Sequence, residues 1–458
     1  MRRPLLLLPT LLLGLCLLSP TARSEDAAKS KLLFEQTDSS PIVNLALVLK
    51  TGGAQDPEGL EGLTNFVGEM LLRGTRSKSK SDFERQLDEL GGEIAVEVRA
   101  EALIIRCSVL NRKIEPFLAL LKEAITEQSF SQKEIEKLRN ELLSGLNDIK
   151  SRDGRLAQEV LPDFLFPDHP YGNFLMGTTK SLRAIKQKNI REHYQRMFSK
   201  NALTLVGSGP IAPTRMTSWL EELNERLTVS KTQFAKLPPV PIGAERRVIL
   251  IDKPERTQTQ VLIAQRGTLI HGEAFFPLYI GNFAFGGGSF SSRLMQEVRV
   301  KRGWSYGAGS SFRYGTRERS WTLSFMPKNQ DTLPALKQVL HMLDELKADG
   351  VTEAEFTQAQ SALANGAAFT SNTPEKRIEN RVLEVTLDLP LGYMDTWKRG
   401  ILETKRKAVN RELEKFISPQ SYTILVLATK TPELLQGLEE STGVKQDQIK
   451  IVPYNAAL

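Results

Sequence analysis

The residues best suited to binding chemistry lie in a glycine-rich segment of the second half of the chain. Gly286, Gly287 and Gly288 open this segment and allow the backbone to turn sharply or to approach another chain closely. Arg299 is expected near the end of the helix that follows, and Tyr306 comes seven residues later. A glycine loop, a basic helix end and a phenol this close together favour a binding site over a segment of the core. The pattern alone leaves the ligand open.

The helix that positions Arg299 is bounded by two local signals. Ser291 or Ser292 can cap its N-terminus, and Gly303 can end it. Positive charge near the C-terminus of a helix is favoured by the helix dipole, and Arg299 has two basic neighbours there. Apolar residues between these limits share one face, which predicts a half-buried helix.

The composition is that of an ordinary soluble globular protein. The 458 residues predict two to four domains, with 40% hydrophobic and 25% charged residues. Residues 1–24 combine a basic start, a short apolar run and small residues near the end, which predicts a cleavable secretory signal peptide. Cys16 allows a lipoprotein interpretation, but the leucine before it is bulky for a lipidation site.

Removal of the signal peptide takes away three arginines and no acidic residue, so the formal net charge falls from +7 to +4. This mild charge does not indicate nucleic-acid binding. Cys107 would be the only remaining cysteine and is expected to be a buried hydrophobe. No later apolar stretch is long enough for a stable membrane span. These features together predict a bacterial envelope protein in the periplasm.

The order of predicted elements recurs in the two halves of the chain. Ser131 and Glu134 form a capping signal at the start of one helix, and Thr352 and Glu355 form the same signal 221 residues later. Apolar strands near the ends of the two halves recur at a similar spacing. Each half mixes helices and strands in an α+β order, which predicts two similar lobes facing one another.

The proline-rich stretch KLPPVPIG, residues 236–243, is the predicted linker between the lobes. An N-terminal domain would then cover residues 25–235, and a C-terminal domain would cover residues 244–458.

The segment GLTNFVGEMLLRGT, which starts at Gly62, resembles the active-site helix of the pitrilysin/insulinase zinc peptidases, the M16 family. Members that hydrolyse peptides carry His-x-x-Glu-His there, in which two histidines hold zinc and the glutamate acts as general base. In this chain, those three positions hold Asn65, Gly68 and Glu69. The resemblance covers almost all of the mature chain and implies a clamshell-like pair of homologous lobes, each a mainly antiparallel sheet packed with helices.

The resemblance also implies a third zinc ligand on a later helix. Glu141 takes that position, and Glu134 precedes it by the seven residues seen in the family. One or two carboxylates and an amide make a poor zinc site, so we predict no metal and no cofactor in this chain. The four histidines, His169, His193, His271 and His341, are too scattered to form a metal set.

The second lobe keeps the family's other motif, an Arg and a Tyr seven residues apart, at Arg299 and Tyr306. The resemblance implies that the tyrosine donates to the oxyanion that forms at the attacked carbonyl, while the arginine binds substrate carbonyl oxygens. Gly286, Gly287 and Gly288 would belong to the same substrate-binding region.

A chain that lacks the zinc motif but keeps the Arg/Tyr pair is expected to be a non-catalytic, substrate-binding subunit. Its partner would be a homologous chain with His-x-x-Glu-His and zinc, in a heterodimer that cleaves peptides, and this chain alone would be inactive. The alternative is a pseudo-peptidase scaffold or peptide-binding module with no role in catalysis. An active peptidase with another zinc set would need ligands that the sequence does not offer.

Overall fold

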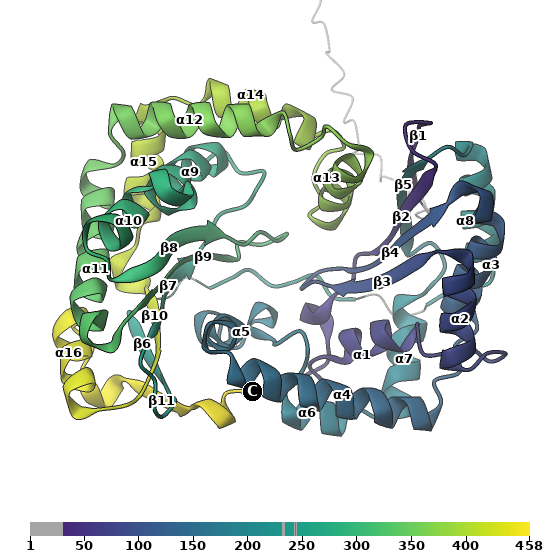
Figure 1. Cartoon of the computed structure of the whole chain (residues 1–458), viewed down its shortest axis with the longest axis horizontal. Helices are drawn as coiled ribbons and strands as arrows, with labels where there is room; N and C mark the ends of the chain where they lie inside the picture. The colour runs from purple at the N-terminus through teal and green to yellow at the C-terminus, as the bar shows by residue number, and fades with distance from the viewer. Residues whose placement is uncertain (1–30, 231–233, 242, 244) are drawn as a thin grey trace, which may run out of the picture.

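The computed structural model describes residues 31–458, apart from 231–233, 242 and 244, so the predicted signal peptide lies outside the described residues (Figure 1). The strands of the first half are β1 (Lys31–Gln36), β2 (Ile42–Leu49), β3 (Glu93–Val98), β4 (Leu103–Leu110) and β5 (Leu203–Gly209). Its helices are α1 (Leu63–Met70), α2 (Lys80–Leu90), α3 (Ile114–Thr126), α4 (Gln132–Ser151), α5 (Asp153–Leu165), α6 (Thr179–Ala184), α7 (Gln187–Met197) and α8 (Pro213–Glu225).

The second half repeats this plan with additions near its end. Its strands are β6 (Arg247–Asp252), β7 (Gln260–Arg266), β8 (Ser305–Phe312), β9 (Ser320–Pro327), β10 (Thr423–Ala428) and β11 (Lys450–Pro453). Its helices are α9 (Phe275–Asn282), α10 (Arg293–Met295), α11 (Thr332–Asp349), α12 (Glu353–Ala367), α13 (Pro374–Thr386), α14 (Trp397–Glu403), α15 (Arg406–Phe416) and α16 (Pro432–Thr442).

The two sheets have the same topology. The first has the order β1-β5-β2-β4-β3, and the second has the order β6-β10-β7-β9-β8 with β11 added beyond β6. In both sheets the pair at the β1 or β6 side is parallel, and the next three pairs are antiparallel. The predicted α+β fold, with two homologous lobes and mainly antiparallel sheets, is therefore confirmed.

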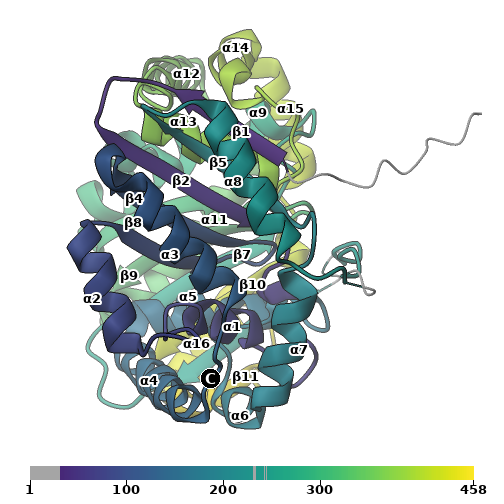
Figure 2. The same cartoon turned by 90° about the vertical axis from the view of Figure 1, so that its right-hand side faces the viewer.

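Each sheet is covered on both faces, and one covering helix comes from the other half. In β2, Leu45 and Leu47 point into the core under the first-half helices, among them α3 and α8 (Figure 2). Val48, on the opposite face of β2, packs against Ile378 and Val382 of α13. In return, α5 covers the face of the second sheet that carries Leu262 and Leu425 (Figure 1). The halves thus exchange one helix each.

Replacing Ile378 with alanine is expected to destabilise the whole chain. Ile378 is 6% exposed, and its side chain fills the space between α13 and the first sheet. Truncating a buried isoleucine costs about 2–5 kcal/mol, depending on how far the cavity collapses. Urea unfolding of the purified chain should show the loss as a single shifted transition. A separate early transition of the second lobe alone would contradict the shared packing.

Local signals in the sequence fix most helix ends but not all of them. Thr352 caps α12 with the expected reciprocal bonds to Glu355, and Ser131 caps α4 through the Glu134 amide. Ser81 and Glu84 have the same capping spacing, which predicts that α2 is capped at Ser81. This prediction is wrong, because Ser79 accepts the hydrogen bond from the Asp82 amide and the helix starts at Lys80. Cys107 is buried in β4, as predicted.

Candidate functional site

The Arg/Tyr segment combines two π-helical turns, which are wider than an α-helix, with a short 3-10 turn, which is tighter. After α9, a π-helical turn over Phe283–Gly287 leads to Ser292, whose side chain accepts a hydrogen bond from the Met295 amide and caps α10. A second π-helical turn, Gln296–Lys301, carries Arg299. Gly303 ends it with φ of 65°, a left-handed conformation that suits glycine, and β8 begins two residues later.

Arg299 and Tyr306 lie together at the surface. The Arg299 guanidinium carbon is 4.4 Å from the centre of the Tyr306 ring and 4.6 Å from the centre of the Phe290 ring. Cation–π attraction therefore holds the guanidinium between two aromatic side chains. Tyr306 is 80% exposed, and its hydroxyl bonds to no atom of the residues that the structure covers. Both polar groups are thus positioned but still free to meet a ligand.

A bulge at the edge of the second sheet turns Tyr306 outward. The register between β8 and β9 shifts between Ser305 and Ala308, so Tyr306 and Gly307 have no directly opposed residue. The Ser305 hydroxyl donates to the Gly307 carbonyl at 2.6 Å and accepts from the Met326 amide at 2.9 Å. Bulges re-aim side chains in this way, and the serine fixes the bulge.

The glycine loop holds this segment against β8. A Cβ atom on Gly286 would lie 2.3 Å from Ser310 Oγ and 2.8 Å from the Ser310 amide nitrogen, so only glycine fits there. Asn282 Oδ1 accepts hydrogen bonds from Ser310 Oγ and from Trp321 Nε1, at 2.6 and 2.7 Å. Gly286 is buried and Gly287 is exposed. A packing role accounts for Gly286, while a substrate-binding role for the loop stays a prediction.

In the first lobe, the glutamates that the family resemblance links to zinc binding contact a guanidinium. Asn65, Gly68 and Glu69 lie on α1, and Glu141 lies on α4. Buried Arg73 forms an ion pair with Glu141, with a second contact of 3.3 Å, and reaches Glu134 at 3.5 Å. The cation that Glu141 meets is therefore an arginine side chain. Sequence reasoning missed Arg73, whose only signal was its position one helical turn after Glu69.

The residues present do not fit a zinc ion. A Cβ atom on Gly68 would lie 2.7 Å from Val96 Cγ1, so β3 fills the space that a general base would need. Burial raises the pKa of the Glu69 carboxyl, the Glu141 charge adds to the rise, and Arg73 opposes it. Among the described residues, no three His, Cys, Asp or Glu side chains are grouped to hold a metal.

A buried polar cluster that the sequence did not single out holds the start of α1. Asp56 accepts hydrogen bonds from the Gly62 and Thr64 amides at 2.8 Å each, and from the Thr64 hydroxyl at 2.5 Å. His193 Nε2 lies 2.8 Å from the same hydroxyl. Thr64 is 0% exposed, so no substrate reaches it. The cluster caps the helix; it is not a catalytic triad.

The His193→Gln variant is expected to change how stability depends on pH. Burial lowers the pKa of His193 to about 4, so folding requires the neutral imidazole, and its contribution is lost as pH falls below about 6.5. Burial also raises the pKa of Asp56 to about 7, which favours folding as pH falls through the same window. The two opposed effects flatten the wild-type profile.

Removing the histidine leaves only the aspartate effect. Between pH 7 and pH 5, the stability of the variant relative to wild type should therefore rise by roughly 2 kcal/mol. Urea unfolding at both pH values measures this difference. Parallel profiles for variant and wild type would show that folding does not change the pKa of His193 and would contradict this expectation.

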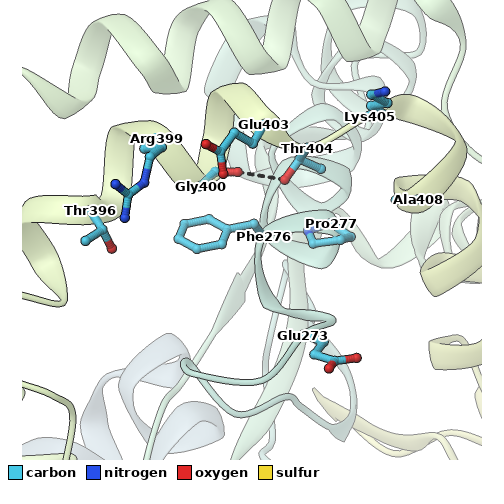
Figure 3. A pocket seen from close by; sticks show the side chains of 10 residues that line it. All are labelled: Glu273, Phe276, Pro277, Thr396, Arg399, Gly400, Glu403, Thr404, Lys405 and Ala408. Atoms are coloured by element: carbon cyan, nitrogen blue, oxygen red, sulfur yellow. Dashed lines mark hydrogen bonds between the residues drawn. The ribbon is translucent and has the colours of Figure 1, made fainter.

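A separate depression of about 520 Å³ lies beside α9 and α14 (Figure 3). Phe276 stands within it, while the charged ends of Glu273, Arg399 and Lys405 lie on different sides of that ring. The Thr404 hydroxyl is already used, since it donates to the Gly400 carbonyl at 2.7 Å (Figure 3). The polar groups of this depression do not converge on one point, so we do not assign a ligand to it.

The helices within the described ranges do not meet the requirements of a membrane span. None of them combines the length and the apolar character required to cross one.

Comparison with known proteins gives the same relationship along most of the chain. Residues 31–179 match the family described as insulinase (peptidase family M16), and residues 184–363 match the peptidase M16 inactive domain. A protein of Helicobacter pylori named non-peptidase homolog YmxG is 23% identical over 91% of this chain and 96% of its own length.

Solved structures share the fold. A crystal structure of a peptidase M16 inactive domain from Pseudomonas fluorescens covers 88% of this chain and 97% of its own, with a TM-score of 0.82 and 22% identity. The periplasmic protease PqqL from Escherichia coli has a TM-score of 0.71 and 13% identity over 89% of this chain, which spans 49% of PqqL. The chain belongs to the M16 peptidase family, as a member that lacks the zinc motif.

Proposed function

We propose that this chain is a non-catalytic, substrate-binding subunit of a periplasmic zinc metallopeptidase of the M16 type. The Arg299–Tyr306 pair carries the proposal, because a half-buried, stacked guanidinium and an exposed phenol are held at a sheet edge without a hydrogen-bond partner among the described residues. A homologous chain with His-x-x-Glu-His would supply zinc and the general base. The relative named non-peptidase homolog supports the view that this chain does not cleave peptides alone.

In this proposal, β8 presents the peptide to the partner's site. It is the outer strand of the second sheet, and an extended peptide can add to such an edge through main-chain hydrogen bonds. Tyr306 would donate to the oxyanion of the attacked carbonyl, and Arg299 would fix the peptide's register. A periplasmic location is supported by the apolar N-terminal segment and by the likeness to PqqL, which is described as a periplasmic protease.

The test is reconstitution from two purified chains. The partner is first identified by co-purification from the native envelope with mass spectrometry and metal analysis. The mature chain alone should then cleave no peptide, whereas the mixture should cleave peptides and lose that activity with a zinc chelator. A partner that is equally active without this chain would favour the scaffold or peptide-binding alternative.

A further inference from the structure

A cavity of about 90 Å³ lies between α5 and the second sheet, on the face that α5 covers. Four hydroxyl side chains line its sheet side, namely Ser311 of β8 and Ser320, Thr322 and Ser324 of β9. Leu161 of α5 lies on the other side. A volume of this size equals about three water molecules in the liquid, so it accepts a small polar group and not a folded segment.

Two arginines line the same cavity without a carboxylate between them. Arg319 Nε is buried and has no hydrogen-bond acceptor within the described part of the chain. Its guanidinium carbon lies 5.0 Å from the centre of the Tyr171 ring. Arg313 is exposed, and its side chain bonds to no acceptor in those residues either. Burial, and secondarily the charge of Arg313, lowers the pKa of Arg319.

The carboxylate that attracts Arg319, that of Glu101, is already satisfied elsewhere. Glu101 accepts hydrogen bonds from the Tyr171 hydroxyl at 2.5 Å, from the Thr316 amide at 2.9 Å, and from the Thr316 hydroxyl. Its charge attracts the Arg319 guanidinium, but it accepts no hydrogen bond from Arg319. A buried donor without an acceptor is rare and costly in folded proteins, and an anion in the cavity would supply one.

We propose that Arg313 and Arg319 bind a carboxylate of a peptide in this cavity. A guanidinium fork matches the two oxygens of a carboxylate, and the four hydroxyls can donate to the same group. The choice of a peptide rests on the proposed function, because Ser311 lies on the strand that carries Tyr306. Five residues separate them, which is about 17 Å along a strand, so one short peptide can reach both.

The test measures binding to the isolated mature chain by fluorescence anisotropy. The probes are three heptapeptides of one neutral sequence, labelled at the N-terminus: a free C-terminal acid, the C-terminal amide, and the amide with a terminal aspartate. The free acid should bind at least tenfold more tightly than the amide, and Arg313→Gln should remove the difference. Arg85→Gln, which changes an exposed arginine on α2, should keep it.

Each outcome decides the proposal. Tight binding of the aspartate amide would assign the site to acidic side chains, whereas its weak binding would assign it to the C-terminus; both support carboxylate binding. Equal affinities of acid and amide, or an unchanged preference in Arg313→Gln, would overturn it. Competition by inorganic phosphate without any acid preference would also overturn it. Because Arg319→Gln could disturb packing, the exposed Arg313 is the deciding position.

The result of this binding experiment does not depend on whether the proposed function is correct. Tyr306→Phe should leave the preference for the acid intact, because the phenol lies outside the cavity. If reconstitution with a partner yields no peptidase but the preference for the acid persists, the proposed function fails and the carboxylate site stands.

Discussion

Tyr306→Phe is expected to lower the turnover number of the reconstituted two-chain peptidase by about 100- to 1000-fold, the usual cost of losing one oxyanion donor. The substitution removes only the hydroxyl, while the ring that stacks on Arg299 stays. The Michaelis constant should therefore change little. Initial rates over a range of peptide concentrations, at equal amounts of assembled complex, separate the two parameters.

Two further substitutions serve as a control and as a comparison for this measurement. Tyr454→Phe removes a phenol remote from β8 and should leave the rate unchanged. Arg299→Ala should mainly raise the Michaelis constant, since a residue that fixes register acts on binding. Full activity of Tyr306→Phe would mean that the phenol takes no part in catalysis and would support the scaffold interpretation.

Gly68→Glu is expected to destabilise the chain by about 3 kcal/mol or more. The first side-chain atom would already lie 2.7 Å from Val96 Cγ1 and 3.1 Å from Leu103 Cδ1, so these core side chains would have to shift to admit it and the atoms beyond it. The carboxylate would also be buried without a designed partner, which adds to the cost. Rebuilding the motif with Asn65→His, Gly68→Glu and Glu69→His should therefore give an unstable protein without stoichiometric zinc.

A matched variant separates the steric effect of Gly68→Glu from the effect of adding two histidine ligands. Asn65→His with Glu69→His leaves Gly68 in place and offers two imidazoles one helical turn apart, so it should fold. Arg73 still neutralises Glu141 in that variant, so adding Arg73→Ala should strengthen zinc binding by releasing the carboxylate. Urea unfolding and metal analysis follow both effects. If the variant with Asn65→His, Gly68→Glu and Glu69→His were as stable as the parent and bound one zinc, the claim that Gly68 has no room for a side chain would be contradicted.

Local sequence predicted the features that depend on neighbours in the chain. The loss of the zinc motif is visible from three positions on one helix, and Arg299 and Tyr306 are seven residues apart. The two-lobed α+β fold followed from repeated capping signals. The choice between Ser79 and Ser81 as the cap of α2 could not be made from sequence, because each serine is followed three residues later by an acidic residue, Asp82 or Glu84.

Features that depend on contacts across the fold could not be predicted. Arg73 meets carboxylates 61 and 68 residues away, and no local pattern marks that pairing. In the sequence, Phe290 is an isolated aromatic residue in a serine-rich turn, and nothing there indicates that its ring stacks on Arg299. The exchange of α5 and α13 was equally hidden, since an apolar helix face does not say which sheet it covers.

That exchange limits how the molecule can move. Each half would leave an apolar sheet face bare if it withdrew its helix from the other, so wide opening of the lobes would forfeit core contacts on both sides at once. The angle between the lobes is therefore built into the fold and is not set by a hinge. Under the proposed function, the partner that completes the site at Tyr306 would therefore reach it by docking and not through a closing motion of the two lobes. The same arrangement is what domain swapping between two half-length chains would leave behind after their genes were joined.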